Sequence, residues 1–135
     1  MSNKPTVFLS GPMRGLSREV SLGWRKQAEE LLKDKFVTMH ALRGREDHET
    51  IPDSRAAIAR DKSDILKADI LLVNDLFENA SMIGTAMETI FAWEAHKIVI
   101  IFGEAHVQDY WLNYHAHMRC TSLEEACEIL NTLFC

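Results

Sequence analysis

The stretch Asp69–Phe102, DILLVNDLFENASMIGTAMETIFAWEAHKIVIIF, decides the fold. It begins with an apolar run, Asp69–Val73, and ends with a second, Lys97–Phe102, each of a length typical of a buried strand. A loop, Asn74–Met82, and a helical segment, Ile83–Ala95, lie between them. A strand, a helix and a second strand in this order predict two parallel strands joined by a crossover.

The rest of the chain repeats this alternation. Two further apolar runs, Thr6–Ser10 and Phe36–Met39, are predicted strands, and a short fifth strand is expected at Met118–Cys120. The other predicted helices are Ser17–Lys33, with an apolar stripe of Val20, Trp24, Ala28, Leu31 and Leu32, then Asp53–Lys67 with Asp53 as N-cap, and Ser122–Leu133, where Ser122 and Glu125 form a capping box.

This order predicts an α/β protein with three layers. A mostly parallel sheet of four to five strands is expected between helices on both faces. The sequence has no internal repeat, linker or low-complexity run, so residues 1–135 are expected to form a single domain.

Composition narrows the classes of function. A net charge of −5 argues against non-specific binding to nucleic acid, which needs a basic surface. No apolar run approaches the roughly 18 residues of a membrane span, and the N-terminus lacks the apolar core of a secretory signal. The three cysteines include no CxxC pair, so they are expected to be inert packing groups in a reducing cytoplasm.

In such a sheet, ligands bind beyond the carboxyl ends of the strands, where the strand order reverses. The loop SGPMRG, Ser10–Gly15, follows the first strand directly. Its glycines allow a ligand to approach the backbone, and its amides together with Arg14 could hold an anion. The alternative is a tight turn with Arg14 solvated.

Glu88 is the first candidate for catalysis. It lies within SMIGTAMETIFAW, near the start of its predicted helix, and its helical neighbours Gly84, Phe91, Ala92 and Ala95 are small or apolar. A carboxylate desolvated in this way has the reactivity needed to attack an anomeric carbon. The alternative is a carboxylate that only stabilises the helix start through the dipole.

Asp61 is the second candidate. It falls inside an apolar stripe made by Ile58, Ile65 and Ala68, where an unpaired aspartate is costly. It is therefore expected to be paired or functional, unless the helix lies along an exposed edge and both Asp61 and Lys62 are solvated.

Other residues give weaker indications. Arg43, nearest the end of the second strand, is a candidate for substrate binding. His115 and His117 form an HxH pair without a third ligand, so no metal site is expected. Tyr110, Trp111 and Tyr114 are expected to be core side chains rather than a stacking surface for a base.

Four segments together resemble the nucleoside 2-deoxyribosyltransferase family. They are FLSGPMRG (Phe8–Gly15), RGRE (Arg43–Glu46), ARDKSDILKADILLVN (Ala59–Asn74) and GTAMETIFAWEAHKIVIIF (Gly84–Phe102). The resemblance implies a flavodoxin-like fold with a five-stranded parallel sheet. It further implies that Glu88 forms a covalent glycosyl intermediate, and that Asp61 positions the sugar and handles the proton of the departing base.

The resemblance leaves two chemistries open. Transferases pass the deoxyribosyl group to a second base, whereas related nucleoside 5′-monophosphate N-hydrolases pass it to water and hold the phosphate with a loop arginine and a serine. Arg14 matches that arginine, and Ser81 lies one place from the position expected of the serine. The motif GTAME favours the transferase. A silent nucleotide-binding module is the alternative outside the enzymes.

The expected ligands are a nucleoside or nucleotide and a nucleobase, with no metal or organic cofactor. A homo-oligomer is expected, in which Asn113 or Trp111 of a neighbouring subunit completes the site. The predicted substrate-binding residues are Ser10, Gly11, Met13, Arg14, Gly15, Arg43, Asn74, Ser81, Gly84 and Asn113.

Overall fold

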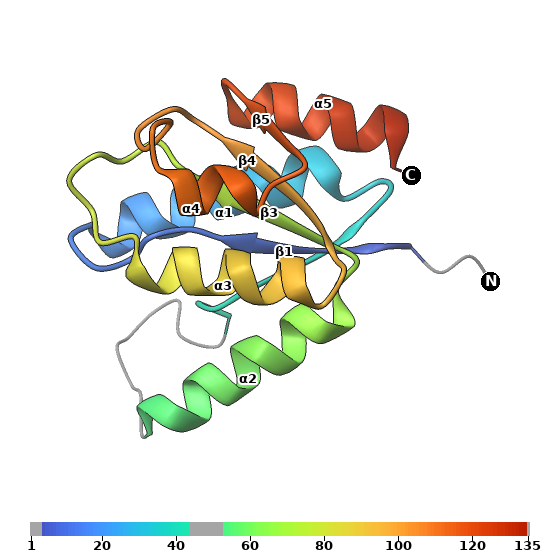
Figure 1. The fold of residues 1–135 in the computed structure, drawn as a ribbon. Coiled ribbons are helices and arrows are strands. Elements are labelled where there is room, and N and C mark those ends of the chain that lie inside the picture. Colours follow the sequence, from blue (N-terminus) through green and yellow to red (C-terminus); the bar gives the residue numbers. More distant parts are fainter. Residues whose placement is uncertain (1–3, 44–52, 135) are drawn as a thin grey trace.

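The computed structural model describes residues 4–43 and 53–134, which form a five-stranded parallel sheet covered by helices (Figure 1). The strands are β1 (Thr6–Ser10), β2 (Val37–His40), β3 (Ile70–Asn74), β4 (Ile98–Phe102) and β5 (Met118–Cys120), and the helices are α1 (Arg18–Leu32), α2 (Ser54–Lys67), α3 (Ile83–Glu94), α4 (Tyr110–Tyr114) and α5 (Leu123–Leu133). None of these helices is long and apolar enough to cross a membrane.

The strand order is β2-β1-β3-β4-β5, with every neighbouring pair parallel. This is the order of flavodoxin-like folds, so the expected fold class is confirmed, including the fifth strand. The order reverses between β1 and β3, and the helices that follow these two strands lie on opposite faces of the sheet. A crevice therefore opens at their carboxyl ends.

Two apolar cores lie on either side of β3, whose five residues are all buried. On one face Val7, Leu9 and Leu72 pack with α1 and α5. On the other, Phe8 and Leu71 pack with α2, α3 and α4. In Figure 1, α3 crosses in front of the sheet with α2 beside it. Burial on both faces explains why the strands are continuous apolar runs rather than alternating ones.

The helix caps explain where three of the helices begin. The side chains of Ser17, Asp53 and Ser122 accept hydrogen bonds from backbone amides in the first turns of α1, α2 and α5. The Glu125 carboxylate accepts from the Thr121 amide, one residue before the cap, rather than from the Ser122 amide of the expected box. The observed bounds differ from those predicted by about one residue, as frayed ends usually do.

The predicted stripe on α1 is wrong at two positions. Val20 is 43% exposed and Leu31 is 40% exposed, whereas Ser21 and Arg25 are buried. The buried face is thus rotated toward residues 21, 25, 28 and 32, because α1 packs against both the sheet and α5. This rotation turns Arg25 inward.

The helix α4 was missed, and its aromatic side chains are not core residues. Tyr110, Trp111 and Tyr114 are 87%, 71% and 72% exposed, which overturns their expected burial. A helix of five residues can bury only one face, and Leu112 occupies that face. The Nδ1 atom of His115, the residue that follows this helix, lies 2.6 Å from the Trp111 carbonyl oxygen.

A buried carboxylate ties the carboxyl ends of β3, β4 and β5 together. Asp75 is fully buried, and it accepts from the Arg119 guanidinium at 2.8 Å and from the His106 amide at 3.0 Å. Gly103 follows β4 with a φ of +98°, and a Cβ there would lie 2.4 Å from the Asp75 carbonyl oxygen. Only glycine fits this position without strain.

Gly103→Ala should therefore destabilise the fold by about 1–3 kcal/mol, because a side chain at positive φ would press on the Asp75 backbone just after β3. Gly23→Ala is the matched control: Gly23 lies inside α1 with open space around its Cα. Alanine there should stabilise the protein by about 0.5–1 kcal/mol. Urea unfolding at constant slope measures both, and equal stability of the two variants would contradict the role given to Gly103.

Candidate active site

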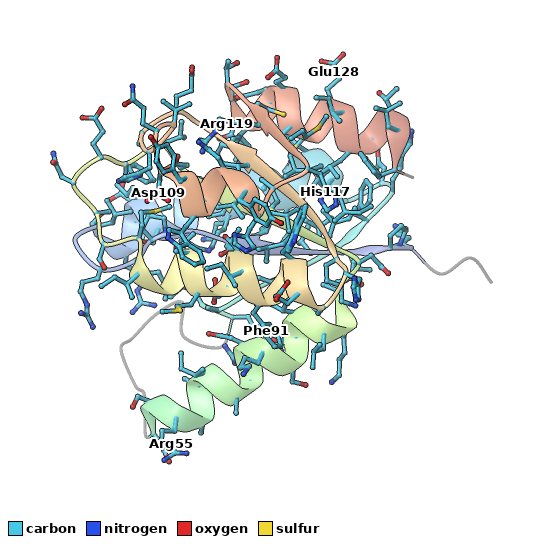
Figure 2. The ribbon with its side chains drawn as sticks, viewed as in Figure 1. Arg55, Phe91, Asp109, His117, Arg119 and Glu128 are labelled. Carbon is cyan, nitrogen blue, oxygen red and sulfur yellow. The ribbon has the colours of Figure 1, made fainter. Side chains whose placement is uncertain are left out.

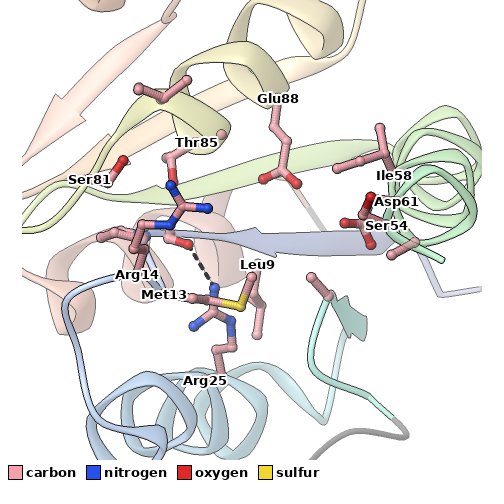
Figure 3. Close-up of a pocket in the computed structure, with 16 residues that line it drawn as sticks. Leu9, Met13, Arg14, Arg25, Ser54, Ile58, Asp61, Ser81, Thr85 and Glu88 are labelled. Carbon is pink, nitrogen blue, oxygen red and sulfur yellow. Dashed lines mark hydrogen bonds between the residues drawn. The ribbon is translucent and has the colours of Figure 1, made fainter. Parts of the chain in front are cut away.

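A cavity of about 370 Å³ lies over the carboxyl end of β1, between α2 and α3 (Figure 3). This is the crevice expected from the reversal of strand order. Glu88 enters it from α3, Asp61 from α2 and Arg25 from the side of α1. Its other lining residues are Leu9, Gly11, Pro12, Met13, Arg14, Ala41, Ser54, Ala57, Ile58, Ser81, Ile83, Gly84 and Thr85.

Glu88 is the sixth residue of α3, beyond the first turn in which the helix dipole acts on a carboxylate. The Ser10 hydroxyl, at the end of β1, donates to Glu88 Oε1 at 2.6 Å. Burial raises the pKa of Glu88 to about 7; the Ser10 hydrogen bond opposes this rise, Asp61 adds to it, and Arg25 opposes it. The carboxyl group is therefore poised to change its charge near neutral pH.

Asp61 is 8% exposed on α2 and faces Glu88 across the cavity. The expected apolar stripe holds at Ile65 and Ala68, which are buried, but Ile58 is 57% exposed and lines the cavity. Asp61 thus lies at the boundary between the core and the cavity. Lys62 points elsewhere: its Nζ lies 4.7 Å from the ring centroid of Phe91, on the side of α3 that faces α2 (Figure 2).

Arg25 was missed by the sequence analysis. It is 1% exposed, its Nη1 donates to the Ser21 carbonyl at 2.8 Å and its Nη2 to the Gly11 carbonyl at 3.0 Å. Its guanidinium stacks on Trp24 at 4.5 Å from the ring centroid. A signal existed, because Arg25 lies three residues before Ala28 and seven before Leu32, on the same helical face.

The loop after β1 closes one side of the cavity. Gly11 packs so tightly that a Cβ would lie 2.7 Å from the Trp24 ring, so glycine is required there. Met13 and Arg14 line the cavity, and Gly15 turns the chain away with a φ of +92°. The Ser81 amide donates to the Arg14 carbonyl at 3.3 Å, which brings this loop beside the start of α3.

Some predicted substrate-binding residues lie outside the cavity lining. The Arg43 guanidinium pairs with the buried Asp64 carboxylate. The Asn74 side chain accepts from the Leu76 amide at 2.9 Å and is fully buried. These two contacts hold loops in place, because buried polar groups need partners.

Asn113 lies on α4, where it donates to the Val107 carbonyl at 2.6 Å and accepts from Arg119 at 2.8 Å. Its expected role in a neighbouring subunit stays a prediction. The polar composition of Ala41–Asp53 also predicts a loop over the site, and most of this segment, residues 44–52, lies outside the described residues. Cys120 and Cys127 are free and buried, and burial raises the pKa of both thiols, which agrees with inert packing groups.

No family model matches the sequence, and the comparison with curated proteins also gave no match. Among solved structures, a 2-deoxyribosyltransferase from Bacillus psychrosaccharolyticus superimposes with a TM-score of 0.70 at 16% identity, over 90% of this chain and 89% of that one. This chain has its fold. The resemblance noted in the sequence therefore extends to the three-dimensional arrangement.

Two other solved structures share the fold. A CMP N-glycosidase from Clostridium botulinum has a TM-score of 0.63 at 16% identity, over 93% of this chain and 97% of that one. A conserved protein from Enterococcus faecalis V583 has a TM-score of 0.69 at 14% identity, over 96% of this chain and 98% of that one. All three match nearly end to end.

The raised pKa of Glu88 predicts a pH dependence of stability. The pKa of Glu88 is 4.5 in the unfolded chain and about 7 in the folded protein, so the folded state holds the proton more tightly. Its contribution to the unfolding free energy therefore falls as the pH rises from about 4.5 to about 7. Glu88→Gln removes the titration. The variant should match wild type near pH 4.5 and exceed its unfolding free energy by about 1–3 kcal/mol above pH 8.

Denaturant titrations across this pH range measure the difference. Glu94→Gln on the exposed side of the same helix is the control and should leave the pH dependence of stability as in wild type. A constant difference between Glu88→Gln and wild type at all pH values would show that Glu88 is not desolvated.

Proposed function

We propose that this protein cleaves or transfers the N-glycosidic bond of a nucleoside or nucleotide by a retaining mechanism, with Glu88 as nucleophile. The observation that supports this best is the Glu88 carboxyl group, oriented by the Ser10 hydroxyl at 2.6 Å inside a cavity with mostly apolar walls. A fixed, partly desolvated carboxylate of this kind is what an oxocarbenium-like transition state requires.

The reaction takes two displacements. A Glu88 carboxylate oxygen forms a bond to C1′ of the sugar while the C1′–N bond breaks, and its electron pair leaves with the base, which takes up a proton. A second base or water then attacks C1′, and the bond between C1′ and Glu88 breaks. Two inversions at C1′ give net retention.

Asp61 is proposed to hold the sugar and to manage the proton of the leaving base. It faces Glu88 across a cavity whose volume, about 370 Å³, suits a nucleoside. Leu9, Met13 and Ile83 offer apolar surface on which a base could lie. The base and the sugar hydroxyls would thereby be placed with C1′ near Glu88.

Two acceptors of the glycosyl group are candidates, a second base and water. The motif GTAME supports a transferase. One observation favours the second candidate, a 5′-monophosphate N-hydrolase: Arg14 and Ser81 line the same cavity and their segments are joined by a hydrogen bond. An arginine and a hydroxyl on one wall could bind a phosphate.

Glu88→Ala should abolish glycosyl transfer and hydrolysis, with a loss of roughly a thousandfold or more, because the two-step path loses its nucleophile. The assay is chromatography of bases and sugars released from deoxynucleosides and their monophosphates. Glu94→Ala, an exposed position on α3, should retain wild-type rates. If folded Glu88→Ala kept more than about a tenth of the activity, Glu88 would not be the nucleophile.

Arg14→Ala should separate the two chemistries. For a 5′-monophosphate substrate it removes charge-assisted hydrogen bonds worth about 1.5–3 kcal/mol, or roughly ten- to 150-fold in kcat/KM. For a free nucleoside the loss should be small. The exposed Arg55, at the outer end of α2 and outside the cavity, gives the control Arg55→Ala (Figure 2).

The measurement is kcat/KM for a deoxynucleoside and its monophosphate, each with and without an acceptor base. If the protein is a transferase, the acceptor base should speed turnover, and kcat/KM for the monophosphate should not exceed that for the deoxynucleoside. A strong monophosphate preference, lost in Arg14→Ala and unaffected by the acceptor, would instead establish the hydrolase.

A further inference from the structure

Arg25 is a charged side chain built into the core next to the site. Its guanidinium is enclosed by the Trp24 ring, the Ser21 carbonyl and the Gly11 carbonyl, and only 1% of the residue is exposed. Moving a guanidinium from water into the core costs several kcal/mol unless hydrogen bonds and opposite charges compensate for the lost hydration. Two neutral carbonyls compensate only part of that cost, so a further stabilising partner is expected.

Four charged or polar groups face Glu88, each from a different element. Ser10 comes from β1, Asp61 from α2, Arg14 from the loop after β1 and Arg25 from α1. Arg14 is exposed to solvent, which screens its charge. Arg25 is fixed and dry, so of the two cations it acts on the carboxylates with the stronger field.

The placement of Arg25, Glu88 and Asp61 in one cavity agrees with the direction of the pKa shifts of Arg25 and Glu88. Burial lowers the pKa of Arg25 to about 10, and the negative charges of Glu88 and Asp61 act in the opposite direction. Arg25 therefore stays protonated at neutral pH. The same attraction lowers the pKa of Glu88, against the burial that raises it.

We propose that Arg25 is a positioning residue of this site, which favours the ionised form of Glu88 through its fixed buried charge and holds the Gly11 end of the loop through its hydrogen bond. It does not touch the reacting atoms. Its catalytic consequence rests on the proposed function, in which only the ionised Glu88 attacks C1′. The effect of the Arg25 charge on the ionisation of Glu88 is independent of the proposed function.

Three variants separate charge from packing. Arg25→Lys keeps the charge and loses the fork of donors, whereas Arg25→Gln loses the charge and keeps one amide donor for the Gly11 carbonyl. Lys26→Gln removes a charge from the exposed face of the same helix and serves as the matched control.

The first measurement needs no substrate. Glu88→Gln is introduced into wild type and into each of the three variants. For each of these four proteins, the difference in unfolding free energy between the forms without and with Glu88→Gln is measured as a function of pH. In Arg25→Gln the pH at which this difference levels off should rise by roughly half a unit to one unit, because the carboxylate has lost a favourable charge. Arg25→Lys and Lys26→Gln should leave that pH within a few tenths of the wild-type value.

The second measurement is the acid limb of kcat/KM, which reports the ionisation of the free enzyme. Arg25→Gln should shift it upward by the same amount, with a roughly three- to tenfold loss below the midpoint and recovery above it. A purely structural role would lower activity equally at all pH values. Absence of activity in wild type would refute the proposed function while leaving the stability measurement valid.

A third measurement covers the case in which Arg25→Gln does not fold. In the wild-type protein, side-chain NMR resonances of Arg25 should follow the titration of Glu88, and in Glu88→Gln this step should vanish. An Arg25 signal that is flat across the Glu88 titration, or an unchanged levelling pH in folded Arg25→Gln, would overturn the proposal.

Discussion

The strands β1 and β3 are covered by helices on both faces, and this burial leaves polar side chains only at the strand ends: Thr6 at the start of β1, and Ser10 and Asn74 at the carboxyl ends. Ser10 ends β1, Asn74 ends β3, and Asp75 follows it. Each of these residues is buried and bonded, Ser10 to Glu88 and Asn74 to its own loop. The same constraint that makes the core apolar therefore concentrates the hydrogen-bonding groups at the edge of the sheet where ligands bind.

The cavity combines features that oppose one another in energy. Two carboxyl groups, Glu88 and Asp61, face each other across the cavity, and both burial and the charge of Asp61 raise the pKa of Glu88. Arg25 brings the compensating charge from the opposite side of β1, at the cost of its own desolvation. The arrangement stabilises the fold poorly, as is common at sites whose groups are arranged for reactivity.

The sequence was sufficient for the fold, because long apolar runs, capping residues and helical periodicity are local signals. Glu88 and Asp61 could be chosen because each interrupts an apolar pattern. The orientation of α1 was not readable, since Val20 and Leu31 are apolar but exposed, and so Arg25 was missed. The pairing of Arg43 with Asp64 could not be read either, because a partner 21 residues away on another element leaves no trace in spacing.

The hydrogen bond between Ser10 and Glu88 joins residues 78 positions apart. Between them lie α1, β2, α2 and β3, so the cavity has no local precursor in the chain. A contact of such long range carries the entropy cost of closing the whole intervening chain, and the packing of the strands and helices between the two residues must offset that cost. A nascent chain that ends before α3 therefore lacks Glu88 and the wall of the cavity that α3 forms, so the site is complete only once α3 has been synthesised and packed.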